Sequence, residues 1–157
     1  MVVEWAHYQR NKPTQSKRRT KIFISDPDPA LRQRFGRLFG VMELDSLQPT
    51  HLRFLHALIE ELEHAYYPQN AVHGPTQTIA AHLEVALRHM NTRLTKLIEA
   101  HQLPEGANDF TFIIGALKER DLVLTHHGNA RALLLHREER HTPKLIDIIP
   151  SNEGTSN

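Results

Sequence analysis

Two acidic side chains near the first long apolar stretch have the types and spacing to do chemistry. Glu43 and Asp45 stand at the end of the apolar run that begins at Leu38. Because residues two apart on a strand point to the same face, the two carboxylates could share one cation. Mg²⁺ and Mn²⁺ prefer such oxygen ligands, but two carboxylates alone hold them weakly. We therefore expect no resident cofactor, and Mg or Mn only if the chain is active.

Other combinations with known chemistry are missing. His126 and His127 are adjacent, so on a strand they point to opposite faces and do not ligate one metal together. His82 and His89 are seven apart on a predicted helix, but no His-Glu-x-x-His pattern accompanies them. The chain has no cysteine, which excludes disulfides and cysteine-ligated zinc. It also lacks the glycine-rich loops that bind phosphates and the Gly-x-Ser-x-Gly nucleophile turn.

Basic residues are concentrated near the N-terminus. Residues 1–20 contain few apolar side chains, so we predict a disordered basic tail there, and a second disordered tail over residues 151–157. An alternative is that the basic arm contacts nucleic acid or acidic lipid. We rank this alternative behind a solvated terminus, because no aromatic residues interleave the basic ones. The residues that would make the contact are Arg10, Lys12, Lys17, Arg18 and Arg19.

Composition indicates one folded domain over residues 21–150. With 157 residues, 39% of them hydrophobic, the chain can bury a core of ordinary size. A formal net charge of +1 gives no general attraction to nucleic acid or membranes. No apolar run is long enough to span a membrane or to form a secretory signal, so we expect a cytoplasmic protein.

Periodicity predicts an α+β fold. Apolar residues recur every three or four positions over 49–66 and 75–101, which predicts two long helices. A loop of about eight residues between them favours antiparallel packing. Short apolar runs predict strands at 21–25, 37–45, 110–117, 122–125, 130–137 and 144–149, and a further helix begins near Pro29. We expect an antiparallel sheet with the two long helices on one face.

Several predicted strands are apolar on both sides. In the segments 110–114 and 146–149, hydrophobic residues are not confined to alternate positions. A sheet that faces water on one side should alternate cleanly. The sequence therefore predicts that a protein partner, or a second copy of the chain, covers the helix-free face.

This order of elements resembles the N-terminal half of the PPM-type metal-dependent serine/threonine phosphatases. Gly128-Asn129-Ala130-Arg131-Ala132 is similar to the Gly-Asp-Ser-Arg-Ala turn of that family, and Leu38–Leu44 looks like the strand that enters its acidic turn. The resemblance covers about residues 35 to 149. It implies half of a double-sheet fold, in which Gly128, Asn129 and Arg131 are structural turn residues. Arg131 would bond carbonyl groups across the hairpin.

The departures from the family pattern concern its metal chemistry. Glu43 takes the place of the leading aspartate of the acidic turn, and Leu44 replaces its glycine. The two later acidic motifs would fall beyond residue 157, and the arginine pattern that binds the substrate phosphate is absent. We therefore expect a catalytically inactive phosphatase-like domain that acts as a protein-interaction or regulatory module. The alternatives are a minimal metal-dependent phosphatase completed by dimerisation or a partner chain, and a nucleic-acid-binding protein that uses the basic arm.

Overall fold

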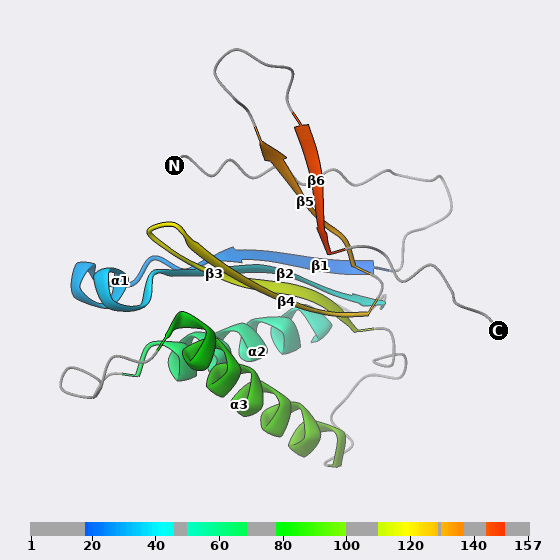
Figure 1. Cartoon of the computed structure of the whole chain (residues 1–157). Coiled ribbons are helices and arrows are strands. Elements are labelled where there is room, and N and C mark those ends of the chain that lie inside the picture. The colour runs from blue at the N-terminus through cyan, green and yellow to red at the C-terminus, as the bar shows by residue number, and fades with distance from the viewer. Residues whose placement is uncertain are drawn as a thin grey trace.

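A computed structural model describes residues 18–45, 50–68, 78–99, 110–128, 130–136 and 144–149. Within them the chain folds as a four-stranded antiparallel sheet with two long helices on one face, and a separate two-stranded sheet (Figure 1). This confirms the predicted α+β class. The elements in chain order are β1 (Arg18–Ile24), α1 (Pro29–Phe35), β2 (Arg37–Asp45), α2 (Thr50–Tyr66), α3 (Ile79–Glu99), β3 (Thr111–Lys118), β4 (Asp121–His127), β5 (Ala132–His136) and β6 (Lys144–Ile149).

The first strand begins earlier than the pattern predicts. β1 starts at Arg18, because Arg18, Arg19 and Thr20 continue the backbone ladder to β2. Local composition is polar there, so only the pairing with β2 reveals the strand. Residues 1–17 and 151–157 lie outside the described residues, as do Arg10, Lys12 and Lys17.

The short helix α1 has clear start and stop signals. The side chain of Asp28 accepts hydrogen bonds from the amides of Ala30 and Leu31 at 2.9 and 3.0 Å, and Pro29 occupies the first turn. Gly36 ends the helix with φ +77°, and its amide donates to the carbonyl of Arg32. A side chain at position 36 would collide with the backbone oxygen of Leu117, so this corner requires glycine.

The sheet has the order β1-β2-β3-β4, with every neighbouring pair antiparallel. Our prediction placed the four C-terminal strands in one sheet, and this is wrong for the last two. β5 and β6 pair only with each other within the described residues. The β3–β4 ladder ends at His127, and Gly128 follows with φ +77°, so the chain leaves the sheet before β5 begins.

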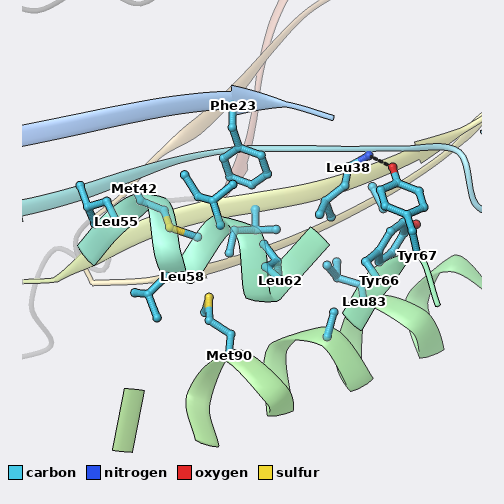
Figure 2. Close-up of a cluster of buried hydrophobic side chains, with 14 of the residues drawn as sticks. Phe23, Leu38, Met42, Leu55, Leu58, Leu62, Tyr66, Tyr67, Leu83 and Met90 are labelled. Atoms are coloured by element: carbon cyan, nitrogen blue, oxygen red, sulfur yellow. Dashed lines mark hydrogen bonds between the residues drawn. The ribbon is translucent and has the colours of Figure 1, made fainter. Parts of the chain in front are cut away.

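The core lies between the sheet and the helix pair (Figure 2). The predicted stripes of both helices are confirmed, because their apolar residues are buried and contact the buried residues of the sheet. The helices contribute Leu55, Leu58, Ile59, Leu62, Tyr66, Ile79, Leu83, Ala86 and Met90, and the strands contribute Phe23, Leu38, Met42, Leu44, Ile114 and Ala116.

Two tyrosines attach the end of α2 to the α1–β2 corner. The hydroxyl of Tyr66 donates to the carbonyl of Phe35 at 2.7 Å, and that of Tyr67 accepts from the amide of Leu38 at 2.8 Å (Figure 2). Ser25 joins this buried group, since its hydroxyl lies 2.8 Å from that of Tyr67. The corner is thereby held against the helix layer by satisfied buried polar groups.

Candidate functional site

The helices α2 and α3 leave one side of the four-stranded sheet uncovered (Figure 1). Alternate residues of each strand point to this side, and the register places them opposite one another. We call this surface the free face. Its positions are Thr20, Ile22 and Ile24 of β1, Arg37, Phe39, Val41 and Glu43 of β2, Thr111, Ile113, Gly115 and Leu117 of β3, and Leu122, Leu124 and His126 of β4.

The centre of the free face is apolar. Its outer strands expose Ile22, Ile24 and Leu122, which keep 40%, 48% and 41% of their surface accessible. The inner strands supply half-buried aliphatic side chains and the buried ring of Phe39. A Cβ atom on Gly115 would lie 2.5 Å from Phe39 Cζ and from Leu124 Cδ2, so both side chains extend over this glycine. The prediction that the third predicted strand is apolar on both sides is confirmed.

Glu43 lies at one end of the free face. Its Oε1 accepts a hydrogen bond from Thr20 Oγ1 at 3.0 Å, and Thr111 is its partner on the other side. Neither cross-strand neighbour is acidic. Asp45 pairs with Arg18 through the backbone, and register places it on the same face as Glu43, but its side chain lies outside the described part.

The metal-site candidate therefore contains two carboxylates along one strand. Within the residues that the structure describes, no group of three or more metal-ligating side chains is found. Two carboxylates leave most of the coordination of a Mg²⁺ ion to water. Such an arrangement binds the ion weakly and does not by itself bring a second ion beside it.

The opposite end of the free face carries basic residues. Arg37 Nη2 lies 3.2 Å from Asp26 Oδ1, and Arg32 Nη1 lies 3.7 Å from the same oxygen. The side chains are well exposed, so these ion pairs contribute little to stability. Two guanidinium groups share one carboxylate, which leaves this end with a positive charge.

The turn that resembles the phosphatase motif has a structural role at two of its positions. Gly128 has φ +77°, and a Cβ there would lie 2.5 Å from Thr111 Cγ2. Arg131 Nη2 donates to Asp147 Oδ2 of β6 at 2.6 Å, a contact that the sequence analysis did not predict. Asn129 lies outside the described residues. The Asp147 contact was missed because only the β5–β6 register brings these two residues together.

The β5–β6 hairpin stands on the free-face side of the sheet (Figure 1). It exposes Leu133, Ile146 and Ile148, with accessible fractions of 50%, 39% and 37%. A two-stranded sheet is only marginally stable without packing against other structure. The hairpin and the free face thus present apolar side chains on the same side of the molecule.

The remaining candidates do not form a site together. His126 and His127 point to opposite faces, as expected, and the ring of His127 stacks on Phe112 at 5.6 Å. Among the five basic residues of the proposed arm, Arg18 and Arg19 belong to β1. An open groove between α2 and α3, which the sequence analysis did not identify, is lined by Arg88, His89, Arg93 and Lys96 among others.

No protein-family model, curated protein or solved structure matches this chain. No helix in the described part of the chain is both long enough and apolar enough to cross a membrane.

Proposed function

We propose that this chain is a catalytically inactive PPM-type phosphatase-like domain that acts by binding protein through its free face. The observation that carries this proposal is the continuous apolar centre of that face, from Ile22 and Ile24 on one edge to Leu122 on the other. Apolar patches of several hundred Å² are uncommon on monomers and mark interaction surfaces.

The energetic argument rests on the exposed edge residues. Covering each of Ile22, Ile24 and Leu122 removes about half of a large aliphatic side chain from water, which contributes about 1 kcal/mol apiece. The half-buried inner residues add to this sum. The free energy from covering these side chains offsets part of the cost of association.

Binding is tested with one substitution on the free face and a matched control. Ile24→Asp places a charge among the apolar residues at the β1 edge of the free face, whereas Val85→Asp alters a side chain of similar exposure, 44%, on the helix side. Size-exclusion chromatography with light scattering should show more than one chain for the native protein and for Val85→Asp. We expect Ile24→Asp to raise the dissociation constant at least tenfold. A native protein that stays monomeric at high concentration contradicts binding through a second copy.

The rival function is a minimal metal-dependent phosphatase. Two observations argue against it. Glu43 and Leu44 stand where the phosphatase turn has aspartate and glycine, and the cross-strand neighbours of Glu43 are threonines. We expect no hydrolysis of p-nitrophenyl phosphate with Mn²⁺ above the rate in buffer. Mn²⁺-dependent hydrolysis that disappears in Glu43→Ala would establish the rival.

A nucleic-acid-binding role is tested by removing residues 1–17, which leaves β1 whole. If the arm binds nucleic acid, affinity falls steeply with salt and vanishes in the shortened chain. We expect no such salt-dependent binding at physiological ionic strength.

A further inference from the structure

We infer that the occupant of the free face is a second copy of this chain, stacked face to face with its strands running opposite to those of the first. This inference rests on the proposed function, because it needs the free face to be a binding surface. It adds the identity of the partner and the direction in which the partner lies.

The first argument is the distribution of charge along β2. Arg37 and Glu43 both point to the free face and are six residues apart, a separation of about 20 Å along a strand. Around Arg37 the formal charges of Asp26, Arg32 and Arg37 leave one positive charge. At the other end, Glu43 contributes one negative charge, and its cross-strand neighbours Thr20 and Thr111 are uncharged.

Two stacked copies can be related by a two-fold axis that runs along or across the strands. An axis along the strands sets each end of the face against the same end of the partner, so like charges meet. An axis across the strands sets the Arg37 end of one copy over the Glu43 end of the other, twice. In a two-fold interface every contact between the copies occurs twice, so the positive end of one copy meets the negative end of the other at two places.

The second argument is the position of the β5–β6 hairpin. β4 ends at His127, which pairs with Phe112 beside the Glu43–Thr111 pair, so the link to β5 leaves the sheet at the Glu43 end. The hairpin then rises on the free-face side (Figure 1). With the axis along the strands, the two hairpins would stand at the same end of the stacked pair. With the axis across the strands, they stand at opposite ends and flank the partner.

The third argument is area. Four strands at the usual spacing, over the length from Arg37 to Glu43, give each free face roughly 400 Å². Two stacked faces alone would therefore bury on the order of 800 Å², which is below the roughly 1,000 Å² expected of a specific interface. The hairpins must contribute, and Ile146 and Ile148, which are exposed on one face of the hairpin, provide apolar surface for this.

Cross-linking tests the orientation, because the chain contains no cysteine of its own. Leu117→Cys, beside Arg37, and Thr111→Cys, beside Glu43, are made separately so that both charges are kept, and a short bismaleimide bridges the ~10 Å between stacked sheets. We expect a covalent dimer in a mixture of the two variants and little in either variant alone. Val85→Cys, on the helix side, serves as the control that should not cross-link.

The hairpin contribution has its own variant. Ile146→Lys with Ile148→Lys changes side chains that are exposed in the single chain, so the fold should be retained. We expect at least a tenfold rise in the dissociation constant of the dimer. An unchanged dissociation constant contradicts the part assigned to the hairpin.

The other outcomes separate this inference from the proposed function. Efficient cross-linking of each variant alone shows strands running in the same direction, which overturns the inference and leaves the free face as the binding surface. A different outcome is that the native chain is monomeric and binds a hydrophobic dye, and that Ile24→Asp abolishes this binding. The free face is then open to another protein, and only the identification of the partner as a second copy is wrong. A monomer without dye binding overturns both.

Discussion

Tyr67 connects the end of α2 to the start of β2 through one hydroxyl group. Its oxygen accepts from the Leu38 amide and lies 2.8 Å from Ser25 Oγ and 3.2 Å from the Gly36 carbonyl oxygen. Burial raises the pKa of this hydroxyl, so it stays protonated at every pH at which the protein is handled. The group therefore works as a neutral, hydrogen-bonded anchor in the core.

Removal of this hydroxyl deprives the Leu38 amide of the closer of its two hydroxyl acceptors. We expect Tyr67→Phe to lower the free energy of unfolding by about 1 kcal/mol, because the buried Leu38 amide loses one of its two hydroxyl acceptors. Urea denaturation monitored by circular dichroism measures the change. Ser25 Oγ also accepts from this amide, at 3.0 Å, so Tyr67→Phe combined with Ser25→Ala should cost more than Tyr67→Phe alone. Equal losses would show that Ser25 does not compensate.

His82 makes stability depend on pH. Its ring packs edge-on against Phe35 at 4.6 Å, and its pKa is lowered from the usual 6.5, first by burial and then by the nearby charge of Arg34. The unfolded chain therefore binds a proton at His82 more readily than the folded chain does. The contribution of the neutral ring is complete above pH 6.5 and is lost as pH falls below 6.5 through the lowered pKa.

We expect the His82 resonances to titrate below pH 6.5 in the folded protein and near 6.5 in urea, as measured by NMR. The stability lost between pH 7.5 and 5.5 should be smaller in His82→Gln than in the native chain. A titration midpoint above 6.5 would reverse the sign and contradict this account.

At the scale of elements, α2 is held by its buried stripe. Leu58 has no accessible surface and belongs to the buried core, whereas Val85 on α3 remains 44% exposed. Leu58→Ala should lower the free energy of unfolding by about 2–5 kcal/mol, through lost burial and the cavity that remains. Val85→Ala is the control and should change it by no more than about 0.5 kcal/mol. Urea unfolding at one protein concentration compares them.

The link between β4 and β5 depends on glycine. Gly128→Ala meets two obstacles, since φ is +77° and the new Cβ would lie 2.5 Å from Thr111 Cγ2. We expect a loss of more than about 1 kcal/mol in the free energy of unfolding, because Ala tolerates neither condition. Gly128→Ala with Thr111→Ser removes the methyl contact and should recover part of the loss. Recovery of the whole loss would show that the backbone angle costs nothing.

At the scale of the whole molecule, an assembly through the free face couples stability to concentration. If folded chains associate and unfolded chains do not, mass action raises the melting temperature as protein concentration rises. We therefore expect the native melting temperature to rise over a hundredfold range of concentration and that of Ile24→Asp to stay constant. Differential scanning fluorimetry measures both. A constant native value contradicts association of the folded chains.

The sequence by itself determined the local features of this protein. The helices α2 and α3 were predictable because an apolar residue every three or four positions is a property of neighbouring residues. The shared face of Glu43 and Asp45 followed from their spacing of two on a strand. The apolar character of β3 on both sides was also readable, because Ile113 and Ile114 are adjacent.

Tertiary structure alone decided which distant segments meet. The ladder to β2 extended β1 into the basic segment, the β5–β6 register joined Arg131 to Asp147, and the separation of the hairpin from the main sheet divided the predicted single sheet. The tertiary structure also placed Thr20 and Thr111 beside Glu43. A carboxylate at either position would have given the metal-site candidate a further acidic ligand. These outcomes depend on contacts between residues far apart in the chain, whose energies no local pattern contains.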